Sequence, residues 1–196
     1  MIEFQGWPKT PRLFRDMIVT EKIDGTNSAV IIEKADLIPG VFIDQSEERL
    51  VRLGGDAFWV AAQSRKRLIT PGKTTDNYGF AQWVFENADA LVDILGPGRH
   101  FGEWWGSGIQ RGYGLLNGEK RFSLFNVLRY SDVHVPEIGL STVPMLASGP
   151  FDLDDVRYIL DDLREAGSAA APGFMRPEGV VVFHEAAGQV FKATLE

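Results

Sequence analysis

The segment Lys22-Ile23-Asp24-Gly25-Thr26-Asn27 places a lysine, an acid and a glycine between two apolar runs. A lysine amine can act as a covalent nucleophile once it has lost its proton. Because lysine amines are protonated at neutral pH, such a site needs burial, neighbouring cations or a base. Gly25 would allow a tight bend and a close approach of a ligand to the backbone. The alternative interpretation is a surface Asp-Gly turn with a solvated lysine.

Three more charged residues stand where they could act on phosphate. Glu103 ends an apolar strand pattern and precedes the glycine-rich stretch 106–112. A carboxylate there could accept hydrogen bonds from a ribose, and backbone amides of the loop could approach phosphates or RNA. Glu178 begins a strand pattern whose hairpin partner carries Lys192. The acid could coordinate Mg²⁺ and the lysine could neutralise phosphate charge, whereas a surface salt bridge is the alternative.

Aromatic residues near these charges have two interpretations. In the stretch 121–127, strand alternation places Phe122 and Phe125 on opposite faces. A purine ring needs a flat apolar platform, which a phenylalanine could supply, but core packing is the default for any single phenylalanine. Trp104 and Trp105 are expected in the core, because most aromatic side chains serve packing.

Other reaction classes find no support. The absence of cysteine excludes disulfides, zinc–thiolate sites and cysteine nucleophiles. His100, His134 and His184 are scattered without metal-ligand spacing. The sequence contains neither a Gly-x-x-x-x-Gly-Lys-Ser/Thr phosphate loop nor a Gly-x-Ser-x-Gly nucleophile elbow.

The elements that must position these residues are mostly strands. Runs rich in Val, Ile, Phe and Trp, bounded by turn residues, predict strands at 17–23, 28–33, 57–62, 99–105, 122–130, 178–184 and 188–194. The last two form a predicted hairpin with Ala187-Gly188 near its turn. Helical spacing predicts helices at 76–95, capped by Thr75 or Asp76, and at 153–166, capped by Asp152. Strands that outnumber helices without regular alternation favour an α+β fold on antiparallel sheet.

Composition adds a few limits. The 196 residues are 44% hydrophobic, enough for one sizeable core, and no linker divides them, so we expect one domain over 1–196. No signal peptide or spanning apolar run is present, which predicts a soluble, cytoplasmic protein without a membrane partner. The net charge is −7, yet basic residues cluster at 12–15, 65–73 and 111–121 while acids collect at 44–48 and 152–165. A positive face and ordinary solvated surface both explain this.

The order of the motifs resembles the covalent nucleotidyltransferase superfamily of ligases and capping enzymes. The most similar branch is the bacteriophage-type RNA ligase 2 family, on the strength of Glu21 to Asn27 and of Gly102-Glu103 through Gly108-Ile109-Gln110. The likeness spans residues 21–194 through ordered segments: Lys-x-Asp-Gly, Ser64-Arg65, Phe101-Gly102-Glu103, a Phe-rich strand, Glu178-Gly-Val-Val and the Lys192 strand. It implies a nucleotidyltransferase (ATP-grasp-like) domain of antiparallel sheets with flanking helices, here an adenylation domain without a separate C-terminal domain.

The resemblance also implies roles. Lys22 would attack the α-phosphorus of ATP and become a lysyl-adenylate, with Glu21 beside the adenine through its backbone or its side chain. Asp24, Gly25 and Asn27 would shape the nucleotide pocket and the contact with the RNA end. Arg65 would contact the ribose and the phosphate end, and Glu103 the ribose. Phe125 would stack on adenine, with Phe122 as the alternative. Glu178 would assist metal binding, and Lys192 would contact the α-phosphate.

The implied activity is ATP-dependent RNA ligation through lysyl-AMP, with Mg²⁺ or alternatively Mn²⁺, on nicked duplex or broken RNA ends. The sequence differs from the family pattern in two ways, which leave alternative functions open. The family usually has two lysines two positions apart in its last motif, but here only Lys192 is present among Val190, Lys192 and Thr194. Relatives also carry a C-terminal domain that engages RNA, so a partner protein in its place is one option. The rivals are a DNA ligase, a GTP-using capping enzyme, or an ATP-binding module that adenylates itself without sealing.

Overall fold

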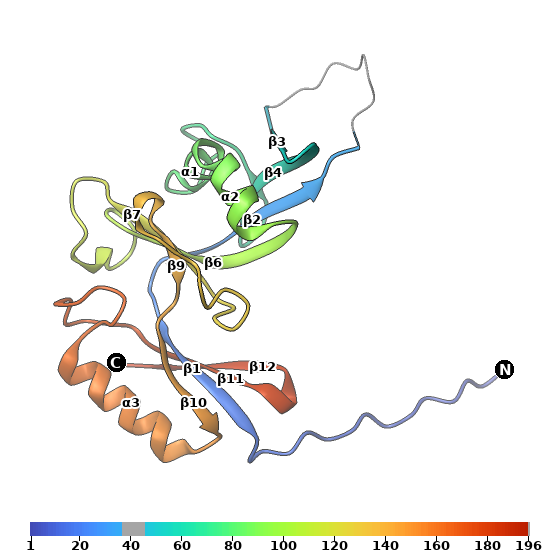
Figure 1. Ribbon diagram of the computed structural model, residues 1–196. Helices are drawn as coiled ribbons and strands as arrows, with labels where there is room; N and C mark the ends of the chain where they lie inside the picture. The colour runs from blue at the N-terminus through green and yellow to red at the C-terminus, as the bar shows by residue number, and fades with distance from the viewer. Residues whose placement is uncertain (37–45, 196) are drawn as a thin grey trace. The chain divides into compact units, whose positions relative to one another are not determined.

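The computed structural model describes residues 1–36 and 46–195 and divides the chain into two compact units (Figure 1). Unit 1 comprises Met1–Lys22 and Pro144–Glu196, and unit 2 comprises Ile23–Val143. The chain therefore changes unit directly after the lysine of the Lys-x-Asp-Gly motif. Asp44 of the predicted acidic cluster lies outside the described residues.

Unit 1 is built on a four-stranded antiparallel sheet. Its order is β10 (Met145–Pro150), β1 (Asp16–Lys22), β11 (Gly179–His184) and β12 (Gln189–Thr194). One face packs against α3 (Leu153–Ala166), and the core between them contains Met17, Val19, Val156, Leu163, Val180 and Val182. The alternation of β1 places Glu21 on this buried face and Lys22 on the opposite face.

The local signals that end the elements of unit 1 lie in the sequence. The side chain of Asp152 accepts a hydrogen bond from the Asp154 amide at the start of α3, and Gly167 follows its last turn in a left-handed conformation. Between β11 and β12, a short 3₁₀ turn, η3 (Glu185–Ala187), leads into Gly188 at φ 59°. Both the predicted helix 153–166 and the predicted hairpin are confirmed.

Unit 2 is built on an eight-stranded sheet whose central strands are β4 (Asp56–Ser64), β2 (Thr26–Lys34), β6 (Gly98–Gly106) and β7 (Lys120–Leu124). Its outer strands are β3 (Arg49–Leu53), β5 (Leu68–Ile69), β8 (His134–Val135) and β9 (Leu140–Thr142). The pairing is antiparallel except between β7 and β9, which run parallel. Two short 3₁₀ turns, η1 (Gly112–Gly114) and η2 (Pro136–Ile138), lie in its loops.

Two helices cover one face of the unit 2 sheet where the sequence pattern predicted one. They are α1 (Phe80–Glu86) and α2 (Ala88–Leu95), separated at Asn87. The Asn87 amide side chain donates to the carbonyl of Trp83, which competes with the helical pattern at that point. The helical segment begins at Phe80 rather than at residue 76, and its N-cap is Gly79. Asp76, four residues before α1, nevertheless accepts hydrogen bonds from the amides of Ala81 and Gln82 in the first turn.

The core of unit 2 lies between these helices and the sheet and contains Val30, Val60, Phe80, Trp104, Phe122 and Leu124. Trp104 and Trp105 are both buried, as expected. The predicted strand 122–130 ends at Leu124, and the next residues turn back, with Tyr130 N–H bonded to the carbonyl of Asn126. Within the described residues, no helix is long and apolar enough to cross a membrane. The α+β class on largely antiparallel sheet is confirmed.

Candidate active site

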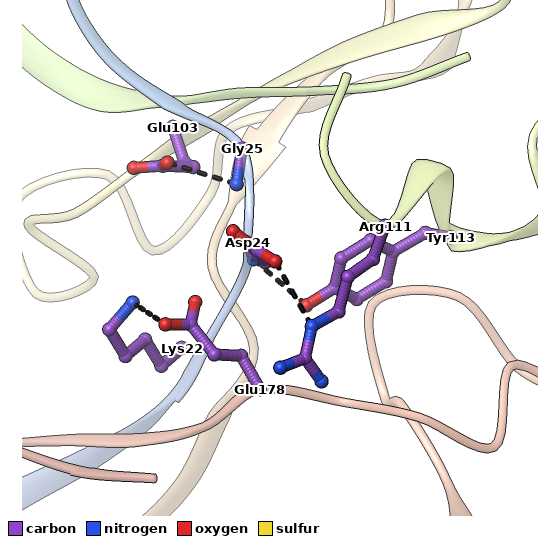
Figure 2. Close-up of polar contacts among 7 residues, drawn as sticks. All are labelled: Lys22, Asp24, Gly25, Glu103, Arg111, Tyr113 and Glu178. Atoms are coloured by element: carbon purple, nitrogen blue, oxygen red, sulfur yellow. Dashed lines mark hydrogen bonds and ion pairs between the residues drawn. The ribbon is translucent and has the colours of Figure 1, made fainter. Parts of the chain in front are cut away.

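Lys22 is the last residue of β1, and its side chain meets an acid from the start of the neighbouring strand. The Lys22 Nζ and Glu178 Oε1 atoms are 2.5 Å apart, and both side chains are about four-fifths shielded from solvent (Figure 2). The two residues come together because Lys22 pairs with Gly179 in the β1–β11 ladder. The predicted nucleophile and the predicted metal-binding acid are therefore neighbours within unit 1.

Across the part of the chain that the structure describes, one carboxylate oxygen of Glu178 has no hydrogen-bond partner. Its Oε2 atom is buried and has no hydrogen-bond partner among the described residues. A buried carboxylate oxygen left without a donor costs about 1–3 kcal/mol or more, so a ligand that binds it would recover that energy. Hard cations such as Mg²⁺ prefer carboxylate oxygen and are held by one or two carboxylates together with substrate phosphates. Among the described residues, no cluster of three or more acidic, His or Cys ligands is present.

Gly179 keeps the backbone beside Lys22 close to the next strand. Its φ is 147°, and a Cβ there would lie 2.2 Å from the carbonyl oxygen of Ala193. A side chain at this position would push β12 away from β11 and displace Glu178, whose carbonyl accepts from the Leu195 amide. The Glu178-Gly179 dipeptide thus fixes the acid against the end of β1.

Glu21 points into the other face of β1 and holds a loop. Its carboxylate is buried and accepts hydrogen bonds from Ser168 Oγ at 2.6 Å and from the Ala170 amide at 2.8 Å. Ser168 Oγ also accepts from the Ala171 amide at 3.0 Å. Burial raises the pKa of Glu21, while its hydrogen bonds to Ser168 and Ala170 act in the opposite direction. The side chain predicted to lie beside adenine is occupied by the loop that runs from α3 to Glu178.

Lys192 lies on the same sheet face as Lys22. In the ladders, Lys22 pairs with Gly179 and Gly179 with Thr194, whereas Thr20 pairs with Val181 and Val181 with Lys192. Paired residues of an antiparallel sheet project to one side, and so do residues two apart on a strand. Lys192 therefore lies on the face that carries Lys22, two strands away and in the neighbouring row of paired residues. Its side chain is exposed.

The second half of the Lys-x-Asp-Gly motif belongs to unit 2. The Gly25 amide donates to Glu103 Oε1 at 3.2 Å (Figure 2). A Cβ on Gly25 would lie 2.4 Å from the carbonyl oxygen of Trp104 and 2.8 Å from the Cβ of Trp105. The predicted close approach at Gly25 is thus toward β6 of the protein itself.

Two residues of the loop after β6 fix Asp24, and only one of them attracted attention in the sequence. Arg111 Nε lies 3.0 Å from Asp24 Oδ2, and the Asp24 amide donates to the Tyr113 hydroxyl oxygen at 2.9 Å (Figure 2). Tyr113 is buried, packs edge-on against Trp105 and adopts a left-handed φ of 49°. A non-glycine residue in this region costs about 1–3 kcal/mol and persists only where its surroundings demand it.

Register brings two predicted residues of unit 2, Asn27 and Glu103, onto one sheet face. Asn27 pairs with Glu103, and Glu103 pairs with Ser123, so their side chains project together. Ser64, which ends β4, pairs with Ser28, and Arg65 follows it into the turn toward β5. Arg65 is exposed in that turn, just beyond the end of the β2–β4 ladder.

The two candidate platforms for adenine differ in exposure. Phe122 is fully buried in the core against Phe80 and Trp83, which leaves no free ring face. Phe125 follows β7 and is 39% exposed, and its amide donates to the carbonyl of Phe101, which is itself 44% exposed. Phe101 is two residues before Glu103 on β6, so it shares that face and is a second platform candidate that the motif order did not single out.

The predicted residues thus form two groups, one in each unit. Unit 1 brings Lys22 and Glu178 into contact and places Lys192 on their sheet face. Unit 2 brings Gly25 and Glu103 into contact and places Asn27 beside them. A separate cavity in unit 2, about 460 Å³ and lined by residues such as Trp83, Lys120 and His134, contains none of the predicted site residues.

Comparisons with known proteins identify a family and similar folds. Residues 15–194 match the RNA ligase family. A Naegleria gruberi RNA ligase variant solved with AMP and Mn is similar at a TM-score of 0.60 and 17% identity, over 93% of this chain and 50% of that chain. Another variant of that ligase, solved with ATP and Mn, is similar at a TM-score of 0.55 and 18% identity, over 91% of this chain and 48% of that chain. The chain thus spans about half the length of these relatives, and the comparison with curated proteins finds no match.

At these identities the solved structures support the α+β fold alone. The family match carries more, because it covers nearly the whole chain and includes both groups of site residues. The conclusion from sequence and fold together is that this chain belongs to the RNA ligase family.

Proposed function

We propose that this protein is an ATP-dependent RNA ligase in which Lys22 accepts AMP and passes it to a 5′-phosphate before a 3′-hydroxyl closes the bond. The observation that carries the proposal is the Lys22–Glu178 contact at the junction of β1 and β11, with a buried carboxylate oxygen left unsatisfied beside the amine. The family match supports the class of reaction, and the ATP and AMP in the Naegleria structures support the nucleotide.

The chemistry begins with the amine. An ammonium has no lone pair, so Lys22 must lose a proton and leave its ion pair before it can attack the α-phosphorus. Attack forms an N–P bond, breaks the bond to the bridging oxygen and releases pyrophosphate. Lys192, exposed on the same sheet face, is proposed to stabilise charge on the α-phosphate.

A divalent cation, Mg²⁺ or Mn²⁺, would be held by Glu178 together with phosphate oxygens. When bound, it would neutralise phosphate charge and polarise the reacting phosphorus. The relatives solved with Mn support a cation of this kind. Glu178 would then exchange its contact with the Lys22 ammonium for a contact with the cation.

The residues of unit 2 are proposed to hold the nucleoside and the RNA end. Glu103 and Arg65 would contact the ribose, and Arg65 also the phosphate end. Phe125 would stack on the base, and Asn27 would line the site. Asp24 and Gly25 would act by shaping the bend, since the Asp24 carboxylate binds Arg111 and the Gly25 amide binds Glu103. The substrates would be RNA ends in the cytoplasm.

The test is formation of a radiolabelled protein–AMP adduct from ATP and a divalent cation. Lys22→Ala should abolish the adduct, because the amine is the group modified. Lys34→Ala is the matched control: Lys34 also ends a strand and pairs with an acid, Asp56, at 2.8 Å. A persistent adduct in Lys22→Ala, or its equal loss in Lys34→Ala, would contradict the assignment.

A second candidate function is self-adenylation without sealing. The single lysine of β12 favours it, because relatives usually have two in this motif. A 5′-phosphorylated nicked RNA duplex, tested with ATP and again in pre-adenylated form, separates the steps. Sealing of only the pre-adenylated strand would show that self-adenylation is the defective step. A protein–AMP adduct without sealing of either strand would support a protein that adenylates itself but does not join RNA. GTP in place of ATP, and nicked DNA in place of RNA, test the capping and DNA ligase alternatives.

A further inference from the structure

The N-terminal arm, defined here as residues 1–12, is the most exposed apolar segment of unit 1. Phe4 and Trp7 are 96% and 91% exposed, and the arm extends away from β1 as a chain without helix or strand (Figure 1). Large aromatic side chains are seldom left in water without a function, because burying one recovers about 150–250 Å² of surface. Exposed aromatics on a peptide arm therefore indicate a binding partner.

The charge of the arm and its base opposes the charge of the whole protein. Residues 4–15 contain three basic residues, Lys9, Arg12 and Arg15, and no acid, in a chain with a net charge of −7. Arg12 and Arg15 form one of the basic clusters that the site described above does not use. Across the described residues, the side chains of Lys9 and Arg12 have no hydrogen bond or ion pair, and both are exposed. These cations are available to an anionic partner.

The base of the arm is fixed although the arm itself is exposed. Nδ1 of His184 accepts from the Ala187 amide at 3.2 Å, so in the neutral ring Nε2 carries the hydrogen and donates to the carbonyl of Leu13 at 2.6 Å. The Phe151 amide donates to the carbonyl of Arg15 at 2.8 Å. Leu13 to Arg15 are thus tied to β11 and β10, directly before the strand that ends at Lys22.

The proline content suits an arm that binds in extended form. Pro8 and Pro11 each fix φ and favour polyproline II backbone, which lowers the entropy lost on binding. Residues 4–12 can span at most about 30 Å, long enough to follow several nucleotides of a strand. Aromatic rings that stack on bases, interleaved with cations that bind phosphates, are the combination by which proteins bind single-stranded nucleic acid without reading sequence.

We propose that the N-terminal arm binds the RNA strand, with Phe4 and Trp7 stacked on bases and Lys9 and Arg12 on phosphates. The biological meaning of this contact rests on the proposed ligase function, but the contact itself is measured without catalysis. The arm would hold a strand next to the element that carries the adenylated lysine. A protein partner or a second copy of the chain are the competing occupants.

The experiment measures binding of a fluorescein-labelled, 5′-phosphorylated RNA with a single-stranded end by anisotropy, over a series of salt concentrations. Lys9→Ala/Arg12→Ala should reduce the dependence of log K on log salt by about 1.4–1.8, as expected for two lost phosphate contacts. Phe4→Ala/Trp7→Ala should weaken binding at fixed salt by about 5-fold to 150-fold for each base no longer stacked. The matched control is Arg157→Ala/Tyr158→Ala on α3, where Tyr158 is 74% exposed in the same unit, and it should bind RNA like the wild type.

The outcomes separate this proposal from the proposed function. Arm variants should keep their melting temperature and still form the Lys22–AMP adduct, while RNA affinity falls. Wild-type RNA affinity in both arm variants would overturn the arm proposal even if the adduct forms. Weaker RNA binding in the arm variants, in a protein that never forms the adduct, would overturn the ligase function and keep the arm. Unchanged RNA binding with altered sedimentation would instead identify the arm as a protein interface.

Discussion

Ser168→Ala tests whether the Glu21 carboxylate, next to Lys22 in the sequence, organises unit 1. Ser168 Oγ donates to Glu21 at 2.6 Å and accepts from the Ala171 amide at 3.0 Å, and both side chains are buried. Removing the hydroxyl takes one hydrogen-bond donor away from the Glu21 carboxylate, which keeps the Ala170 amide as a donor. It also leaves the Ala171 amide without its acceptor. Each loss costs about 1–2 kcal/mol, the lower part of the range for a buried polar group left without its partner, so we expect the free energy of unfolding to fall by about 2–4 kcal/mol.

The consequences divide into stability and activity. For a chain of this size, the loss corresponds to a melting temperature lower by about 4–16 °C. Because the 168–171 loop continues to Glu178, a loosened loop should also slow formation of the Lys22–AMP adduct at a temperature where the variant is folded. Loss of the Ser168 hydrogen bond also removes one of the interactions that lower the pKa of Glu21, so this pKa should rise further.

Asp152→Ala is the control for Ser168→Ala. It removes the helix cap of α3, in the same unit, at a cost of about 0.5–2 kcal/mol, but Asp152 does not contact the loop residues Ser168 to Ala171 by any recorded bond among the described residues. Thermal unfolding and a time course of adduct formation are measured for both variants. An unchanged melting temperature in Ser168→Ala would refute the hydrogen-bond argument. A destabilised Ser168→Ala that adenylates at the wild-type rate would refute the link to Glu178.

Three further predictions concern unit 2. Tyr113→Phe keeps the ring against Trp105 but removes the acceptor of the Asp24 amide, so formation of the protein–AMP adduct should slow about 5-fold to 30-fold. Tyr130→Phe is the control: it also loses a buried hydroxyl contact, but it should lower the melting temperature without slowing adduct formation. Gly25→Ala should destabilise by about 1–3 kcal/mol in chemical denaturation, because its Cβ would meet a β6 carbonyl at 2.4 Å. Burial lowers the pKa of His100 below its ordinary 6.5, so below pH 6.5 the unfolded state binds more protons than the folded state. The free energy of unfolding should therefore fall as the pH drops below 6.5. His100→Gln should make the free energy of unfolding depend less on pH in this range.

Elements with strong local signals were predictable. The helix Leu153–Ala166 has both its cap and its terminating glycine in the sequence, and the apolar runs of β1, β2, β4 and β6 have clear borders. The break at Asn87 was missed because both halves share one apolar stripe. Short strands such as β5 and β8 were missed because two residues carry no periodicity, and their pairing depends on partners distant in sequence.

Site residues differ in the same way. Lys22, Glu103 and Glu178 stand in motifs whose order along the chain is informative. Tyr113 and Ser168 act through contacts with Asp24 and Glu21 that span 89 and 147 residues, and neither lies in a recognisable motif. Among the positive-φ residues of this loop, Gln110 and Tyr113 give no sequence signal either, because glycine is the residue expected there.

The register of β12 explains how one missing lysine could matter. Val190, Lys192 and Thr194 all project from the sheet face that carries Lys22, but only Thr194 stands in the row of Lys22, across Gly179. Gly179 has no side chain to separate Lys22 from Thr194, and a side chain is excluded at this position because its Cβ would collide with the Ala193 carbonyl oxygen. Two lysines and one carboxylate, Glu178, then offer a net charge of only +1 to a polyphosphate on this face. Two lysines cannot neutralise a triphosphate, so in the proposed reaction a divalent cation bound at Glu178 would supply most of the balancing charge. Adenylation should then depend more steeply on the cation concentration than on Lys192.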